Sequence, residues 1–555
     1  MTNLRSKIAF LVTIIAVLGT QNSHSFSLPK IKLPDIKNCS IFAKCLLKSV
    51  WHTITKKTEL DRNWAAIYHA HATIIQDPQQ ASQHFKQIIK NTSINTAEFK
   101  FGLSSSAYQF EGGIINECAS TRFYNNHGLA TPGKACDFWN NYETMIKEIA
   151  EKTYIKTFRL EVFWSRIQPH SPGTFDEKAL QHYKKIIKTI KKYNIEPLVV
   201  FHHYTIPTWF EDIGGFEKKE NINHFVHFCT KVYQTLQQDV TYWSTFNTVE
   251  GYAFKGYYTA EGAPGIKGDM QKTATVIKNM LESHVRVYKA IKRLYKIHAS
   301  TYKKYQAMKI PEPQIGIQKN ILPLDPASTT WKQKILSAYL LPLGSQIVCD
   351  IGNMFQNEGF YNFFTTGTYQ AYIPTKVLVK HTNKDAPNCL DWIGVNTYSN
   401  RYMYLGKEVK EKDPEKQTLN PNYRFYPQGI YRAIQEVANQ IAKPIGKLKG
   451  MDSIPIWVTE NGIPTEYNNK NDDAKRTRFF QQALFTISQA IADGYRVEAY
   501  LPWASHDNYE WGAKKGFGTK PYGFFQVDPK NPAGPHPLKK GSEYFCNFVQ
   551  AFYNK

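Results

Sequence analysis

The sequence lacks the features typical of zinc-binding, membrane-spanning or disordered proteins. Its eight cysteines are scattered over 555 residues and form no closely spaced pairs of the kind that bind zinc. No apolar run is long enough to span a bilayer comfortably, and low-complexity tracts and internal repeats are missing. With 42% hydrophobic and 14% aromatic residues, the composition is that of a globular protein with a substantial core.

Acidic residues are also few, 46 against 69 lysines and arginines, which gives a formal net charge of +23. The lysines stand largely in scattered pairs, such as Lys184-Lys185 and Lys514-Lys515. The positive field is therefore spread over the surface instead of forming one dense block. No nucleic-acid-binding motif accompanies the charge, so we expect solvated surface lysines and no nucleic-acid partner.

The N-terminus has the pattern of a secretory signal peptide over residues 1–25. Arg5 and Lys7 precede the apolar run from Ile8 to Leu18, and small residues follow at the spacing that a signal peptidase prefers. The sequence predicts export, to a secreted, periplasmic or lumenal location, with no stable membrane insertion after signal removal.

Disulfides are permitted in such a compartment, but eight cysteines allow 105 pairings and a core of this size does not need them. Cys229 and Cys349 lie in apolar stretches and are interpreted as small core residues.

The rest of the chain divides into two parts. Residues 26–97 carry helical spacing without chemistry, and predict a helical N-terminal extension that is either packed on the main domain or used for docking. Residues 98–555 repeat a short apolar strand, a turn and an amphipathic helix, which predicts an α/β fold, a (β/α)8 TIM barrel with rim insertions. The strands are expected at Phe99–Leu103, Thr157–Val162, Pro197–Phe201, Tyr242–Phe246, Gln314–Gln318, Trp392–Val395, Ile454–Val458 and Val497–Leu501.

The seventh expected strand ends in a carboxylate. The apolar run from Ile454 is followed by Glu460 and then by Asn461-Gly462. A buried parallel strand fits this run best, and it places Glu460 at the C-terminal rim, where barrel enzymes carry their chemistry. Taken alone, a Glu before Asn-Gly is equally well explained as a turn residue.

Polar and aromatic side chains follow the other expected strands as well. In a barrel they converge on one mouth. Amides, carboxylates and rings together suit a ligand with many hydroxyls and one apolar face, so the predicted ligand is a sugar. These residues are Gln109, Arg159, His202, His203, Asn247, Asn396, Tyr398, Trp503, Glu510 and Trp511.

Several long motifs, in the right order, resemble those of the family 1 glycoside hydrolases, the β-glucosidase family. The resemblance covers about Lys100 to Phe545 and implies a barrel that hydrolyses β-linked glycosides with retention, without a metal or organic cofactor. The matching stretches are Phe101–Gly112, Phe158–Leu160 with Trp164–Ile167, Asp391–Asn396, Thr459–Gly462 and Trp503–Trp511.

The resemblance also implies roles for single residues. Glu460 matches the nucleophile, and Arg159 and Tyr398 match the residues that hold it ionised and oriented, since a neighbouring guanidinium favours a charged carboxylate. It places Asn247 near the 2-hydroxyl of the substrate. The residues implied to surround the sugar are Gln109, His203, Asn247, Trp503, Glu510 and Trp511. The alternative for His203, Trp503 and Trp511 is that they are packed core side chains.

Glu510 further restricts which sugars the site is expected to bind. Family members that take 6-phosphorylated sugars resemble this chain in a Lys-x-Tyr, here Lys520-Pro521-Tyr522, but carry a small hydroxyl residue in place of Glu510. A carboxylate repels phosphate, so a neutral glucose-like or galactose-like sugar is favoured.

The sequence departs from the family at the second catalytic carboxylate. Where the family has Asn-Glu-Pro, this chain has Asn247-Thr248-Val249, and the spacing to the next shared motif needs no gap. Thr248 therefore occupies the acid/base position, and a threonine hydroxyl cannot protonate a leaving oxygen near neutral pH. Either the aglycone leaves unaided, as in plant myrosinases, or Glu250 or Glu161 assists.

Two functions follow as hypotheses. The first is an exported retaining β-glycosidase. The second is a sugar-binding or receptor-like pseudoenzyme, similar to Klotho-type relatives of the family. Glu460, Arg159 and Tyr398 together favour the enzyme, because binding alone has little need of a nucleophile with its charge partner.

Overall fold

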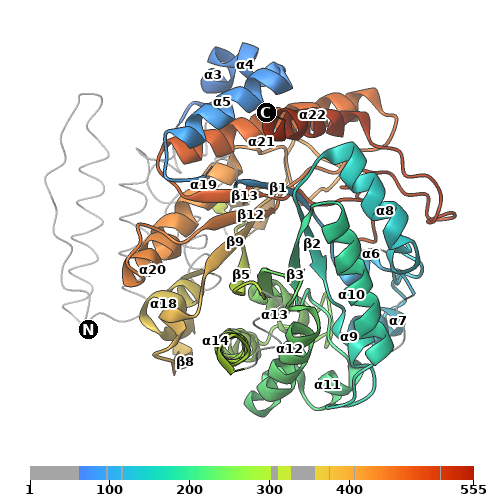
Figure 1. The fold of residues 1–555 in the computed structure, drawn as a ribbon, viewed down its shortest axis with the longest axis vertical. Coiled ribbons are helices and arrows are strands. Elements are labelled where there is room, and N and C mark those ends of the chain that lie inside the picture. Colours follow the sequence, from blue (N-terminus) through green and yellow to red (C-terminus); the bar gives the residue numbers. More distant parts are fainter. Residues whose placement is uncertain are drawn as a thin grey trace, which may run out of the picture.

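A closed barrel of eight parallel strands forms the centre of the computed structural model (Figure 1). The structure describes residues 62–95, 98–113, 117–301, 310–326, 357–373, 376–404, 407–512, 514 and 516–554. The predicted (β/α)8 barrel is confirmed, because each expected strand overlaps an observed one. The barrel strands are β1 (Lys100–Ser104), β2 (Thr157–Glu161), β3 (Glu196–Val200), β4 (Tyr242–Asn247), β5 (Gln314–Asn320), β9 (Trp392–Asn396), β12 (Ile456–Glu460) and β13 (Val497–Tyr500).

Helices cover the outside of the barrel, and one of them shows why they form. Helix α10 (Glu177–Lys192) begins after Asp176, whose side chain accepts a hydrogen bond from Ala179 N. Two lysines in its last turn complement the helix dipole, and its buried residues recur with helical spacing on one face. The other long helices are α8 (Phe138–Thr153), α12 (Ile222–Leu236), α14 (Met270–Thr301), α21 (Lys470–Ala492) and α22 (Glu543–Tyr553).

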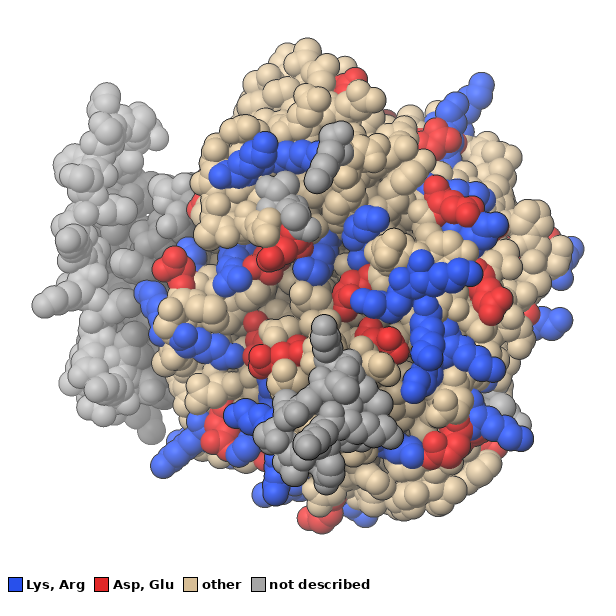
Figure 2. All heavy atoms as spheres, in the orientation of Figure 1, with Lys and Arg blue, Asp and Glu red and all other residues tan. Residues whose placement is uncertain are grey.

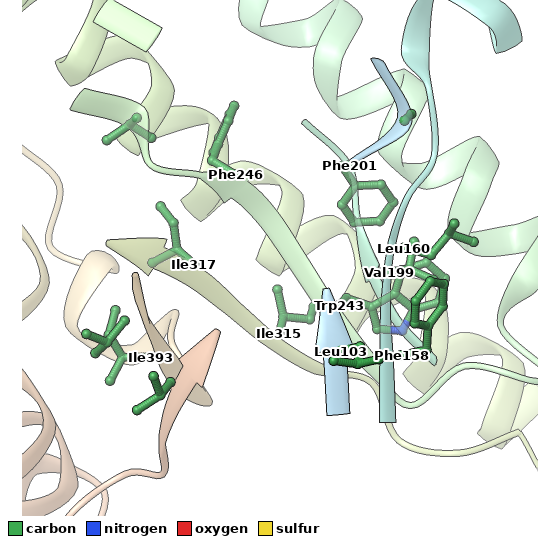
Figure 3. Close-up of a cluster of buried hydrophobic side chains, with 14 of the residues drawn as sticks. Leu103, Phe158, Leu160, Val199, Phe201, Trp243, Phe246, Ile315, Ile317 and Ile393 are labelled. Carbon is green, nitrogen blue, oxygen red and sulfur yellow. The ribbon is translucent and has the colours of Figure 1, made fainter. Parts of the chain in front are cut away.

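The outer face of the barrel strands is apolar. Phe158 and Leu160 of β2 lie on this face beside Phe201 and Trp243, whose rings stack with centroids 5.3 Å apart (Figure 3). Each of these side chains is almost completely buried, and such burial is typically worth about 1.5–3 kcal/mol per large apolar side chain. Alternate residues point the other way, so the same strand presents Arg159 to the barrel interior.

The barrel interior is closed at one end by an apolar floor. Trp392 and Trp457 stack there, with ring centroids 5.0 Å apart, next to Leu198, Ala499 and Leu501. Further along the same strands the interior becomes polar, and the carboxyl ends of the strands open into a pocket.

Rim insertions separate several of the barrel strands. Between β5 and β9 lie β6 (Leu324–Pro326), helix α18 (Gly359–Thr366) and the antiparallel pair β7 (Thr368–Ile373) and β8 (Lys376–Thr382). Between β9 and β12 lie β10 (Arg401–Tyr404), β11 (Lys407–Val409), α19 (Gly429–Val437) and α20 (Lys443–Leu448). Strand β10 joins β6 and β11 in a small sheet.

Three N-terminal helices, α3 (Trp64–Ala70), α4 (Ala72–Gln76) and α5 (Pro78–Lys90), pack on the main domain beside α21 and α22 (Figure 1). Phe85 of α5 meets Phe101 and Phe548 edge-on, at 5.6 and 5.7 Å. Of the two uses considered for the 26–97 extension, its described helices show packing. Residues 26–61 and the predicted signal peptide 1–25 lie outside the described residues, so export and the domain limits stay predictions.

The five cysteines in the described part of the chain, Cys118, Cys136, Cys229, Cys389 and Cys546, are buried and free. Cys229 is a core residue, as predicted, while Cys349 lies outside the described residues. Among the described helices, none combines the length and apolar character that a membrane crossing requires.

Lysines and arginines are interspersed with acidic residues on the face of the molecule in Figure 2. Exposed ion pairs among the described residues include that of Lys191 with Glu196 at 2.7 Å and that of Lys272 with Glu217 at 3.0 Å. Such pairs contribute little to stability. On this face the positive charge is spread out, as the scattered lysine pairs predict.

Candidate active site

The carboxyl ends of the strands surround a cavity of about 360 Å³. Most of the residues predicted to form the site line it, including Gln109, His203, Asn396, Tyr398, Glu460, Trp503, Glu510 and Trp511. Thr248, Glu250 and Lys520 of the Lys-x-Tyr motif line it as well, together with Tyr204 and Lys255, which sequence reasoning did not place in the site. Arg159 and Asn247 are buried directly behind the lining.

Glu460 is the last residue of β12, and both of its carboxylate oxygens are held. Arg159 Nη2 lies 2.6 Å from Oε1 in a buried ion pair, and the Tyr398 hydroxyl donates a hydrogen bond of 2.7 Å to Oε2. Burial raises the pKa of Tyr398 well above its usual range, and the Glu460 charge adds to the effect, so the phenol stays a donor. The carboxylate is oriented and open to the pocket, as a nucleophile requires.

Arg159 is itself fixed by a polar layer that crosses the barrel. Its Nη1 donates to Gln318 Oε1 at 2.8 Å and to Asn247 Oδ1 at 3.3 Å. Asn396 donates to the same Asn247 oxygen at 2.7 Å, and Thr459 Oγ1 donates to Asn396 at 2.7 Å. The layer joins β2, β4, β5, β9 and β12. Such a connected, water-excluded network rigidifies the groups that it holds.

Strand register explains why these residues meet. Ser104 of β1 pairs with Arg159, Asn247 pairs with Gln318, and Glu460 pairs with Asn396. The pairs place the last residues of neighbouring strands at similar depth in the barrel. Gln318 was not predicted as a site residue, although a polar side chain in the apolar β5 run was a usable signal.

His203 is a neutral donor or acceptor for a ligand. Burial lowers the pKa of His203 well below its usual value, and the Arg159 charge contributes to this. Its Nε2 pairs with the Asn247 amide at 2.9 Å, while its buried Nδ1 has no partner among the described residues. A neutral imidazole whose Nε2 accepts carries its proton on Nδ1, so the free nitrogen can donate to a sugar hydroxyl.

The carboxyl group of Glu510 lines the pocket and has one oxygen without a hydrogen-bond partner among the described residues. Its Oε1 is buried and has no described partner. Burial raises the pKa of Glu510 from 4.5 to about 8, although Lys520 and Lys255 lower it. Gln109 differs, because its amide is already engaged: it accepts from Ser106 Oγ and donates to Tyr509 O. Gln109 therefore anchors the segment that carries Glu510.

The two predicted tryptophans are both packed and part of the pocket wall. Trp511 stacks on Tyr108 with centroids 5.1 Å apart, and Trp503 lies 5.4 Å from the Arg159 guanidinium carbon. The packed-ring alternative and the sugar-binding role are thus compatible at both positions. A ring fixed in this way offers a preorganised face for the C–H side of a sugar.

Thr248 occupies the position that the sequence predicts for the acid/base group. It follows β4, adopts φ +57° and begins helix α13 (Val249–Tyr257). Its Oγ1 lies 2.6 Å from the Tyr204 hydroxyl. A Cβ at Gly251 would lie 2.5 Å from Tyr204 Oη and 2.8 Å from Thr248 Oγ1, so a glycine is needed at this close approach. Two neutral hydroxyls stand at this position instead of a carboxylic acid.

The two alternative acids are held elsewhere. Glu250 is buried, and its Oε1 accepts from Lys319 Nζ at 2.8 Å and Asn320 N at 2.9 Å, while its Oε2 is buried without a hydrogen-bond partner among the described residues. Glu161 accepts from two backbone N–H groups, those of Ala107 and His203, at 2.7 and 3.0 Å. Glu161 thus orders two loops behind the pocket, and burial raises its pKa well above the usual range.

A (β/α)8 barrel with an arginine-paired carboxylate at its C-terminal rim, inside a pocket of amides and indoles, defines the class of barrel glycosidases. The profile of Glycosyl hydrolase family 1 matches residues 91–552. The chain belongs to this family.

Relatives support the assignment over most of their length. A 6-phospho-beta-galactosidase from Clostridium acetobutylicum is 26% identical over 476 residues, covering 78% of this chain and 92% of the relative. Beta-glucosidase A from Acetivibrio thermocellus is 25% identical over 457 residues, covering 78% and 94%. The solved beta-glycosidase from Pyrococcus horikoshii is 26% identical, with a TM-score of 0.65, covering 83% of this chain and 96% of that one.

Proposed function

We propose that the protein is an exported, retaining β-glucosidase-like enzyme that acts on β-glycosides with a good leaving group. The observation that carries this proposal is the Glu460 carboxylate, which faces the pocket and is held by Arg159 at 2.6 Å and by Tyr398 at 2.7 Å. A protein that only bound sugar would gain nothing from confining a buried charge in this way, since such confinement is costly.

In the proposed reaction the glycone lies between Trp503 and the donors of His203 and Glu510. A Glu460 oxygen attacks the anomeric carbon and forms a glycosyl ester, while the bond to the aglycone oxygen breaks. Water then attacks the ester, releases the sugar and restores Glu460. Asn247 lies behind Glu460. It accepts a hydrogen bond from Arg159, which helps to hold that arginine against Glu460.

The leaving group is constrained by Thr248. General acid assistance is typically worth about 10² to 10⁴ in rate, so its loss penalises aglycones that must be protonated and spares those that leave as stable anions. The proposed substrates therefore carry an activated aglycone.

The glycone is proposed to be a neutral hexose. The relatives named above include both a beta-glucosidase and a 6-phospho-beta-galactosidase, and this chain has Glu510 in the pocket with an unpaired oxygen suited to a hydroxyl. That carboxyl group would repel a phosphate only in its ionised form, which burial shifts to pH values above about 8.

The second candidate is a sugar-binding pseudoenzyme. The hydroxyl pair of Thr248 and Tyr204 favours it, because no carboxylic acid stands at the acid/base position. The two candidates share the glycone pocket and differ only in turnover.

Initial rates on 2,4-dinitrophenyl and alkyl β-glucosides, with and without azide, distinguish the candidates. We expect turnover of the dinitrophenyl substrate, acceleration by azide, little action on the alkyl glucoside, and loss of all turnover in Glu460→Ala. Glucose binding without turnover of either substrate would instead support the pseudoenzyme. Export is tested by the N-terminal sequence of protein recovered outside the producing cell, which we expect to begin near residue 26.

A further inference from the structure

Lys255 places a positive charge in the pocket wall. It lies on α13, two helical turns after the N-cap Thr248, and its side chain lines the cavity. Its Nζ lies 4.7 Å from the ring centroid of Tyr204 and 5.8 Å from that of Trp511. The ammonium group therefore sits above the phenol whose hydroxyl binds Thr248.

The ammonium group of Lys255 has no bound carboxylate among the described residues. Within the described residues Lys255 forms neither an ion pair nor a hydrogen bond through Nζ, and only ring contacts hold it. Two other lysines of the molecule behave differently: Lys319 and Lys539 are buried and have carboxylate partners at 2.8 and 2.7 Å. Lys255 differs from them in being only partly buried, and it lines the cavity without a carboxylate partner among the described residues, so its ammonium is available to an anionic ligand.

Charges of both signs surround Lys255. Burial lowers the pKa of Lys255, and a second cation, Lys520, adds to the effect. Glu261, Glu510 and Glu460 act on it through space in the opposite direction. The Glu460 charge is already matched by Arg159 and that of Glu250 by Lys319.

We propose that Lys255 contacts the departing aglycone and stabilises its negative charge, so that the substrates are β-glycosides whose aglycone leaves as an anion, such as a phenolate or a carboxylate. This inference rests on the proposed hydrolase function. Because Thr248 cannot deliver a proton, the bond electrons remain on the aglycone oxygen. A fixed cation and two neutral hydroxyls beside that oxygen lower the free energy of the transition state.

The step balances without a proton. One Glu460 oxygen forms the bond to the anomeric carbon, and the glycosidic C–O bond breaks with its electron pair passing to the aglycone oxygen. The aglycone departs as an anion paired with the Lys255 ammonium. Water later cleaves the glycosyl ester. This releases the free sugar and one proton to solution and restores the Glu460 carboxylate.

The test compares Lys255→Met and Lys255→Arg with the natural chain and with Lys272→Met. Lys272 is an exposed α14 lysine paired with Glu217, outside the pocket, and serves as the matched control. For 2,4-dinitrophenyl β-glucoside we expect kcat/KM to fall about 10²-fold in Lys255→Met, which is the typical cost of one lost charge-stabilising donor, and to stay within about 5-fold in Lys255→Arg.

Two inhibition constants separate this role from a structural one. In Lys255→Met, inhibition by 2,4-dinitrophenolate is expected to weaken by at least the factor lost in kcat/KM, while inhibition by glucose stays unchanged. Equal losses for both inhibitors, or an unchanged kcat/KM in Lys255→Met, would overturn the proposal. If the natural chain has no turnover, the proposed hydrolase has failed, and weakened dinitrophenolate binding still reports separately on the anion site.

Discussion

The hydroxyl oxygens of Tyr204 and Thr248 lie 2.6 Å apart, at the position that the sequence predicts for the acid/base group. The contact depends on Gly251, since any Cβ there would overlap both oxygens. Thr248 is thus part of a packed arrangement of three residues. This arrangement determines what restoring the acid requires.

Thr248→Glu alone is expected to give a small gain in alkyl glucoside hydrolysis, because the longer side chain competes with the Tyr204 hydroxyl for space. Thr248→Glu combined with Tyr204→Phe removes that hydroxyl, and we expect alkyl glucoside kcat/KM to rise by about 10² to 10⁴ with loss of azide acceleration. Initial rates on both substrates measure this. Tyr204→Phe alone is the control and should not gain activity; a gain in that variant would contradict the argument.

Gly251→Ala tests the close approach directly. The new methyl group would lie 2.5 Å from Tyr204 Oη, so the phenol must move, and overpacking of this kind costs about 1–3 kcal/mol of unfolding free energy. Chemical denaturation of Gly251→Ala measures that loss. Gly262→Ala is the matched control, because its Cβ meets only Lys255 Cβ, at an ordinary 3.6 Å. Equal stability of the two variants would show that Tyr204 is not confined.

Glu250→Gln decides whether Glu250 is the replacement acid. Its ion pair with buried Lys319 predicts a structural role, so the variant should lose about 3–5 kcal/mol of stability while the rate ratio between dinitrophenyl and alkyl glucosides stays constant. Glu250→Gln with Lys319→Met removes both charges and should recover part of the stability. A selective loss of alkyl glucoside activity would identify Glu250 as the acid.

The barrel and the position of Glu460 at the end of a strand were predictable from the sequence because each depends on local pattern. Apolar runs of strand length alternate with amphipathic helices, and Glu460 ends one such run. Contacts between side chains from different strands were not predictable in this way. The pairing of Glu250 with Lys319 and the use of Gln318 by Arg159 depend on the relative register of β4, β5 and β2, which no single stretch of sequence specifies.

Tyr204 and Lys255 were missed for a related reason. Tyr204 follows two histidines that drew attention first, and its role appears only when α13 brings Thr248 and Gly251 against it. Lys255 is one lysine among many in a basic chain. Its distinguishing property is the lack of a described carboxylate partner inside a pocket, which is visible only in three dimensions.

Glu510 provides a pH-dependent prediction with a definite sign. Burial raises the pKa of Glu510 from 4.5 to about 8, against the attraction of Lys520 and Lys255 and with the repulsion of Glu460 and Asp507. Below pH 4.5 the group is protonated in both states, and its neutral form is fully compatible with burial. As pH rises from 4.5 towards 8 the unfolded chain ionises first, so stability is lost across this window, at up to about 1.4 kcal/mol per pH unit.

The measurement is the unfolding free energy of the natural chain and of Glu510→Gln from pH 5 to pH 9. The glutamine has the same size and cannot ionise, so the free energy of the natural chain should fall relative to that of the variant up to about pH 8 and run parallel to it above. Glucose affinity should show an inflection near the same pH in the natural chain and none in the variant. Parallel stability curves over the whole range would mean that Glu510 is ionised at neutral pH, and that the carboxylate faces the sugar with its charge.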